Sequence, residues 1–199
     1  MRISTMILAV MSILVMGGVG KRTLQGIGVN SRTALFFMLC IFALSGFEII
    51  FSDEISASPA CIAAAAWMYG YAHSSKAVCR KRMLLLPVSV VIGITGAALM
   101  PESNEDWLSY AIGAAAIPIT AVFGSGFGMA AAALAPVFAA FFSFVLDGIG
   151  QSISSLEMGE MTLAAQLSGI LFGISSEMIF YRFGKGFTNE KKVKLNTMD

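Results

Sequence analysis

Three polar side chains that could do chemistry fall inside long apolar runs of the chain. Glu48 belongs to the run at 33–52, and Gln166 and Glu177 belong to the run at 161–181. Ionisable groups inside a membrane are costly, and they commonly mark ion or proton pathways. We therefore predict that Glu177 and Gln166 line a path for a small solute and that Glu48 lies at its outer mouth.

A simpler interpretation of the two acids stays open. By residue count, Glu48 lies about one turn from the outer end of its helix, and Glu177 about one turn from the inner end. Glu48 would then belong with Asp53 at the outer interface, while Glu177 would pair with Arg182 or with the basic segment at 80–82. The two acids are too far apart along the bundle axis to form one carboxylate pair.

No constellation of residues predicts catalysis. A serine hydrolase would need a histidine beside its nucleophile, and His73 is the only histidine of the chain. Ser125 stands between two glycines, where a structural role is the usual one. The cysteines form no CxxC pair, so we predict no catalytic residue, no metal site and no cofactor.

Small residues recur at a spacing of four in the last apolar run. Ala165, Gly169 and Gly173 lie along one face of the predicted helix, with Glu177 next in the same register. The GxxxG spacing of the glycines lets a neighbouring backbone approach closely. The three residues are predicted to be helix-packing positions, and the pattern turns Glu177 toward the bundle interior.

The composition indicates a membrane protein. Hydrophobic residues make up 57% of the 199 residues, and charged residues only 13%. Continuous apolar runs favour helices over the alternating pattern of a barrel. The predicted fold class is therefore all-α, a polytopic bundle of about seven transmembrane helices. Its partner is the lipid bilayer of the cell (cytoplasmic) membrane, and no nucleic-acid patch is present.

One long uncharged stretch, Leu108 to Leu146, organises the prediction. As a single straight helix it would reach about 58 Å, against a hydrocarbon core of roughly 30 Å. It must therefore cross the membrane, turn and cross back. We place the tight turn at the glycine-rich segment 124–128, and the turn residues are Gly124, Ser125, Gly126 and Gly128.

The distribution of charge predicts the orientation of the bundle. The predicted spans are Ser4–Val19, Thr33–Ser52, Ser58–Ala72, Met83–Met100, Leu108–Phe123, Met129–Leu146 and Met161–Tyr181. The linkers between them are alternately basic and acidic. With the N-terminus outside, twelve of the thirteen Lys and Arg residues lie in the cytoplasm, with Arg2 as the exception. Residues 1–184 form the transmembrane domain, and 185–199 form a basic cytoplasmic tail. A signal peptide at the first run is the alternative to an uncleaved first helix.

Two segments carry a resemblance to a family. They are Gly26-Ile27-Gly28-Val29-Asn30-Ser31-Arg32-Thr33-Ala34-Leu35, and the run from Leu163 to Gly173 followed by Glu177. Both are similar to an uncharacterised family of prokaryotic polytopic membrane proteins, defined as a domain of unknown function. In that family the last helix is also rich in glycine and ends near an acid, usually Asp where this chain has Glu. The resemblance implies a membrane fold and brings no functional residue with it.

We therefore expect a small-solute or ion transporter, not an enzyme. The alternative is a non-catalytic membrane scaffold or assembly protein. Its contact surfaces would be the 148–160 loop and the face of Gly169 and Gly173. A homo-oligomer or a membrane protein partner is compatible with either function.

Overall fold

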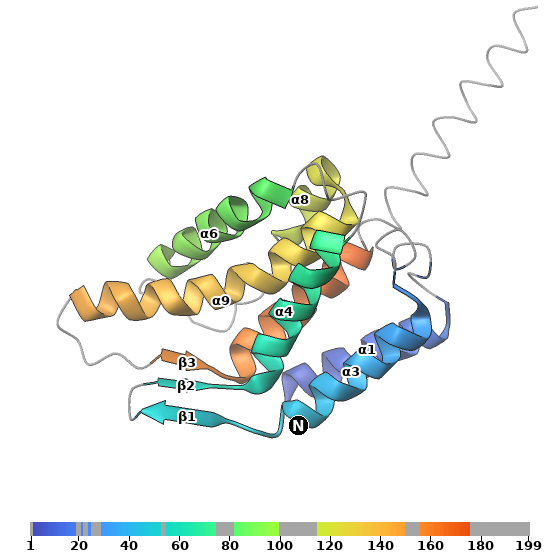
Figure 1. Cartoon of the computed structure of the whole chain (residues 1–199), viewed down its shortest axis with the longest axis horizontal. Helices are drawn as coiled ribbons and strands as arrows, with labels where there is room; N and C mark the ends of the chain where they lie inside the picture. The colour runs from blue at the N-terminus through green and yellow to red at the C-terminus, as the bar shows by residue number, and fades with distance from the viewer. Residues whose placement is uncertain are drawn as a thin grey trace, which may run out of the picture.

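The computed structural model describes residues 2–18, 21, 24, 29–52, 55–74, 82–99, 115–149 and 156–175. This part of the chain is mainly helical, as predicted (Figure 1). The labelled helices are α1 (Ile3–Met16), α3 (Ser31–Leu44), α4 (Pro59–Ser74), α6 (Arg82–Leu99), α8 (Ala116–Phe123) and α9 (Ser125–Ile149). Residues 160–175 form a further helix, called here helix 160–175.

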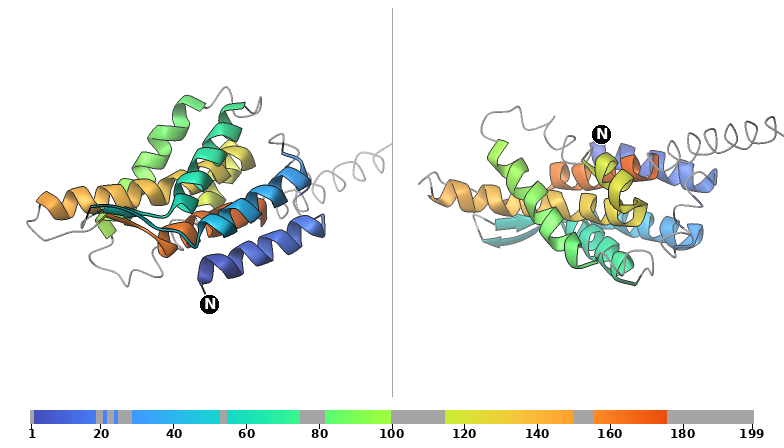
Figure 2. Two further views of the ribbon diagram at one scale, coloured as in Figure 1. Left: turned by 60° about the horizontal axis from the view of Figure 1, so that its bottom comes forward. Right: turned by 90° about the horizontal axis from the view of Figure 1, so that it is seen from above.

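The helices form two groups. α4, α6 and α8 all pack against the long helix α9, and the contact between α6 and α9 is the most extensive. α1 and α3 lie side by side as a second group, which contacts the rest of the bundle through α4 and helix 160–175 (Figure 2). The contact between α3 and α4 includes a stacked pair of rings, Phe37 and Trp67, with centroids 3.6 Å apart.

A three-stranded sheet lies at one end of the bundle, which we call the strand end (Figure 1). Its strands are β1 (Ile49–Ser52), β2 (Ile55–Ala57) and β3 (Leu156–Met158), in the order β1-β2-β3. β1 and β2 are antiparallel, whereas β2 and β3 are parallel. β3 also contacts α9. The backbone N–H of Ser58 donates to the carbonyl of Met158 at 2.8 Å, which fixes the start of α4 beside β3.

The sheet corrects the predicted span Thr33–Ser52. The helix ends at Leu44, and Ser45 and Gly46 form the turn that follows. Ile49, Ile50 and Phe51 are β-branched or aromatic residues, and they continue as strand β1. A short apolar run gives no periodicity that separates strand from helix, so the hydrophobic pattern alone could not find this boundary.

The break in the central apolar stretch lies where it was predicted but is shorter. α8 ends at Phe123, Gly124 has a φ of +99°, and α9 begins at Ser125. Gly124 alone makes the turn, because its backbone lies in the left-handed region that favours glycine. Ser125, Gly126 and Gly128 belong to the first turns of α9, so their assignment to the turn was wrong. Residues 108–114, the predicted start of the preceding span, lie outside the described residues.

Within the described residues, one helical segment is long and apolar enough to cross a membrane. This segment is Gly126–Val145 in α9. The helical segments Ile3–Met16, Ser31–Leu44 and Met83–Ala98 are apolar but shorter.

Candidate functional site

Polar side chains gather at the strand end, where α1, α4 and helix 160–175 begin. We call this group the strand-end polar cluster. Its members are Ser4, Ser58, Cys61, Glu160 and Gln166. Each member lies at the start of a helix or within the first two turns of that helix. Burial of polar groups is favourable only when their hydrogen bonds are satisfied, so the partners of each member decide what the cluster can do.

Glu160 joins the first described helix to the last. Its Oε1 accepts a hydrogen bond from the backbone N–H of Ser4 at 2.7 Å, and its Oε2 accepts one from the Ser4 hydroxyl at 2.7 Å. Ser4 is fully buried and is the second residue of α1, where the backbone N–H has no partner within its own helix. Glu160 is also the first residue of helix 160–175. One carboxylate therefore lies at two helix N-termini, where the helix dipoles favour a negative charge.

Cys61 is the second junction of the cluster. Its thiol lies 3.5 Å from the carbonyl of Met158 and 3.4 Å from that of Gly159, and it donates to them. These contacts hold the first turn of α4 against the end of β3. α4 begins at Pro59, directly after Ser58, which agrees with the predicted start of this span at Ser58. The Ser58 hydroxyl is buried and has no hydrogen-bond partner among the residues that the structure describes.

Gln166 is the cluster member in the second turn of helix 160–175, and it is fully buried. Its Nε2 donates to the carbonyl of Cys61 at 3.1 Å and to that of Ala133 at 2.7 Å. The amide thereby ties helix 160–175 to α4 and α9. Its acceptor in α9, Ala133, lies three residues before Pro136. Both donor hydrogens are used. The Oε1 atom is buried and accepts no hydrogen bond from any residue of the chain that the structure describes.

The two predicted acids are not brought together with Gln166. Glu48 lies four residues beyond the end of α3, is exposed, and accepts a hydrogen bond from the Ser56 hydroxyl at 2.8 Å. Its placement inside a helix was wrong, because the helix ends at Leu44. Glu177 lies outside the described residues, so its predicted position next to the Gly173 face stays a prediction.

The predicted packing residues are all buried. Ala165, Gly169 and Gly173 lie on helix 160–175, and a side chain at Gly173 would lie 2.8 Å from Cγ of Met129 in α9. The small residues thus serve contacts within the chain. A scaffold that used the face of Gly169 and Gly173 to bind a partner would find both glycines buried, with Met129 of α9 against Gly173.

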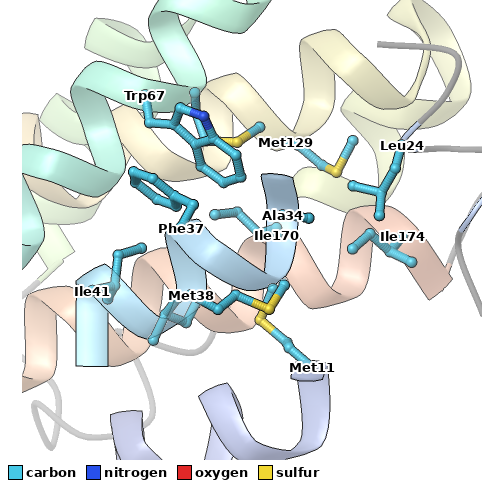
Figure 3. Close-up of a pocket in the computed structure, with 12 residues that line it drawn as sticks. Met11, Leu24, Ala34, Phe37, Met38, Ile41, Trp67, Met129, Ile170 and Ile174 are labelled. Carbon is cyan, nitrogen blue, oxygen red and sulfur yellow. The ribbon is translucent and has the colours of Figure 1, made fainter. Parts of the chain in front are cut away.

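A small apolar cavity lies between the pair α1 and α3 and the rest of the bundle (Figure 3). Its volume is about 20 Å³, close to the room that one water molecule needs. Four methionines from four helices line it, together with aliphatic and aromatic side chains: Met11, Met38, Met68, Met129, Phe37, Trp67 and Ile170 among them. An apolar cavity of this size stays dry, so it is not a site for a polar solute.

Sequence reasoning missed Glu160, Ser4 and Cys61. The sequence pattern places Glu160 in an acidic outer linker and begins the last helix at Met161. One signal was present, because an acid directly after Gly159 and before an apolar run is a favourable helix start. Its bond to Ser4, 156 residues away, could not be inferred from a local pattern.

The side chains of the cluster act through hydrogen bonds. Among the described residues, no three His, Cys, Asp or Glu side chains are placed to hold a metal ion together. Gln166 offers an acceptor atom to a hydrogen-bond donor or a small cation. No protein-family model, curated protein or solved structure matches this chain.

Proposed function

We propose that the chain is a multi-pass protein of the cytoplasmic membrane with its N-terminus outside and about seven spans. The first support is the outer surface of the short apolar helices. Large apolar side chains are exposed on α1, α3 and α6, among them Ile13, Phe36, Leu39 and Val91. In water such a surface would be unfavourable, whereas acyl chains accommodate it. Gly126–Val145 has the length of a complete crossing.

The second support is the separation of charge. Glu48 and Glu160 lie at the strand end. Lys21 lies between α1 and α3, and Arg32 is the second residue of α3. Both residues are therefore at the end of the α1–α3 pair that is opposite to the strand end. This arrangement follows the positive-inside rule when the strand end faces outward. Arg2 is the exception, and its guanidinium donates to the carbonyl of Ser45 at the strand end.

Two exposed positions at opposite ends of α3 test the orientation. We expect Glu48→Cys to react with a membrane-impermeant maleimide added to intact cells, because this residue would lie outside. Arg32→Cys is expected to react only after the membrane is permeabilised. Labelling of the unsubstituted chain measures the contribution of its own cysteines. Reaction of Arg32→Cys in intact cells at the rate of Glu48→Cys would contradict the proposed orientation.

Within this membrane setting we propose that the protein moves or gates a small cation. One observation carries this proposal, namely that the buried Oε1 of Gln166 has no donor among the described residues. A buried acceptor left unpaired costs about 1–3 kcal/mol, and a bound solute would remove that cost. The break at Gly124 adds to the support, because interrupted helices often border transported solutes. Glu177 remains a candidate for the inner part of such a path.

Flux through proteoliposomes tests this function with defined probes. Sodium, potassium and protons are offered as cations, and chloride serves as the anion for which Oε1 has no affinity. We expect one of the cations to move, and Gln166→Leu to slow it by about three- to tenfold, the value of one hydrogen bond.

Ser168→Ala is the matched control for this flux measurement. Ser168 is a buried polar residue of the same helix, but its hydroxyl bonds only to the carbonyl of Ala165 at 2.9 Å. Cation flux through the Ser168→Ala protein should equal that through the unsubstituted chain. Absence of flux for every cation, or equal flux from folded Gln166→Leu protein, would contradict transport and favour the scaffold function.

A further inference from the structure

The partners of Gln166 fix the orientation of its amide. Its Nε2 donates to two carbonyls, that of Cys61 at 3.1 Å and that of Ala133 at 2.7 Å. A carbonyl only accepts hydrogen bonds, so the atom that faces both of them must be the amide nitrogen. The other atom is then the oxygen Oε1, which is buried and has no hydrogen-bond partner among the described residues.

A second oxygen beside this amide loses its helical donor because of a proline. Pro136 is buried within α9 and has no backbone N–H. In an α-helix that N–H would bond to the carbonyl four residues earlier, which here belongs to Ala132. Ala132 is 2% exposed and directly precedes Ala133, the residue that accepts from Gln166. Two oxygens with unused acceptor capacity, one from a side chain and one from the backbone, therefore lie at the same contact between α9 and helix 160–175.

The chemistry of these two oxygens selects a monovalent metal cation. Carbonyl oxygens replace the hydration shell of alkali cations in membrane proteins, and helix carbonyls released from their intrahelical bond are frequent ligands. Amide and peptide oxygens do not titrate near neutral pH, so the pair does not carry a proton. Calcium and magnesium are usually bound by carboxylates, and neither oxygen belongs to one.

We propose that Gln166 Oε1 and the carbonyl of Ala132 form a binding site for a sodium or potassium ion, and that Pro136 is the positioning residue that makes the carbonyl available. The site rests on the proposed function, and it narrows the solute from a small cation to an alkali metal ion. The amide of Gln166 is held in place by its two hydrogen bonds, so its oxygen is oriented before the ion arrives.

The surroundings of the site lower the cost of a buried positive charge. Glu160 directly follows Gly159, whose carbonyl accepts from the Cys61 thiol at 3.4 Å, so an acidic residue belongs to the same junction. A negative charge nearby stabilises a cation strongly where the dielectric constant is low. Ser58 lies one turn nearer to the strand end, and its buried hydroxyl is the other side-chain oxygen without a partner among the described residues. It offers an ion entering from the strand end a further oxygen.

Pro136→Ala tests the site without removing a side-chain ligand. Alanine restores the N–H that bonds to the Ala132 carbonyl, and it suits a helix interior. The midpoint of thermal unfolding of the full chain in detergent is measured in sodium or potassium chloride, against N-methylglucamine chloride at the same concentration. For the unsubstituted chain, one of the two metal ions should raise the midpoint by about 3–6 °C at ten times its dissociation constant. This rise should be lost in Pro136→Ala and in Gln166→Leu.

Pro87→Ala is the matched control. Pro87 also lies inside a helix, α6, but it is exposed, and the carbonyl four residues earlier belongs to the exposed Met83. The rise caused by the metal ion should be retained in this variant. Each rise is measured within one variant, so a change in the basal midpoint does not affect the comparison.

Two outcomes would overturn the site, namely no rise with either metal ion, or an equal rise in the unsubstituted chain and in folded Pro136→Ala. Gln166→Leu decides the question alone if Pro136→Ala does not fold. Flux distinguishes this proposal from transport. A rise in the midpoint without cation flux would contradict transport and leave the site intact. Flux of sodium or potassium with an unchanged rise in Pro136→Ala would contradict the site alone.

Discussion

Gly93→Ala should lower the free energy of unfolding by about 1–3 kcal/mol, the usual cost of an overpacked core. Gly93 lies in α6 at the contact with α9. A Cβ atom there would lie 2.5 Å from Cβ of Phe138, and 3.0 Å from the backbone of Phe138 and Ala139. Backbone atoms of a packed helix cannot move aside individually. Relief of this contact therefore requires separation of the two helices along their most extensive interface.

A second glycine gives the matched control with the opposite sign. Gly70 also lies inside a helix, α4, but a Cβ atom added there would meet no other atom within 4 Å. Gly70→Ala should raise the free energy of unfolding by about 0.4–1 kcal/mol, because alanine restricts the unfolded chain and favours the helix. Thermal unfolding of both variants in the same detergent measures the difference. Equal stability of the two would contradict the close packing of α6 on α9.

The helix boundaries that sequence reasoning predicted well are those with local chemical signals. α4 begins at Pro59 after Ser58, and α6 extends from Arg82 to Leu99 where Met83–Met100 was expected. Gly124 was identified as part of the turn because only glycine readily takes its positive φ. In each of these places, a residue of distinctive backbone preference or a charge stands at the end of an apolar run.

The features that were missed depend on contacts between distant parts of the chain. Strand β1 forms because Ile49–Ser52 finds β2 as a partner, and the composition of that run suits a helix and a strand alike. The position of Gln166 was predicted to be interior, but its bonds to Cys61 and Ala133 follow from how three helices meet. The close approach at Gly93 likewise has no signal in α6 alone. Tertiary packing decides these features, and a single sequence does not report it.

Loss of the Glu160 carboxylate is the second change for which we expect a large effect. Glu160→Ala should lower the free energy of unfolding by about 2–3 kcal/mol, because it removes two charge-assisted hydrogen bonds to Ser4. The backbone N–H of Ser4 would then be buried with no acceptor. Arg2, the residue before α1, makes no capping bond with its own side chain, so α1 has no local substitute for the lost acceptor.

Hydrogen exchange locates the effect as well as measuring it. We expect the amides of α1 to exchange faster in Glu160→Ala than in the unsubstituted chain, since the start of the helix would open locally before the bundle unfolds. The amides of α9, which has its own contacts with α4 and α6, should change much less. Uniform acceleration in both helices would contradict a specific link between Glu160 and α1.

Glu48→Ala provides the matched comparison for this carboxylate. Glu48 also accepts a hydrogen bond from a serine hydroxyl, at 2.8 Å from Ser56, but both residues are at the surface. Water replaces the lost partner there, so the expected change is within about 0.5 kcal/mol. If Glu160→Ala cost no more than this surface substitution, the carboxylate would not be the group that fastens α1 to helix 160–175. The difference between the two variants therefore measures what burial and the additional hydrogen bond from the Ser4 backbone contribute to a glutamate–serine contact. These two terms are the physical reason that one acid at the strand end is structural and the other is not.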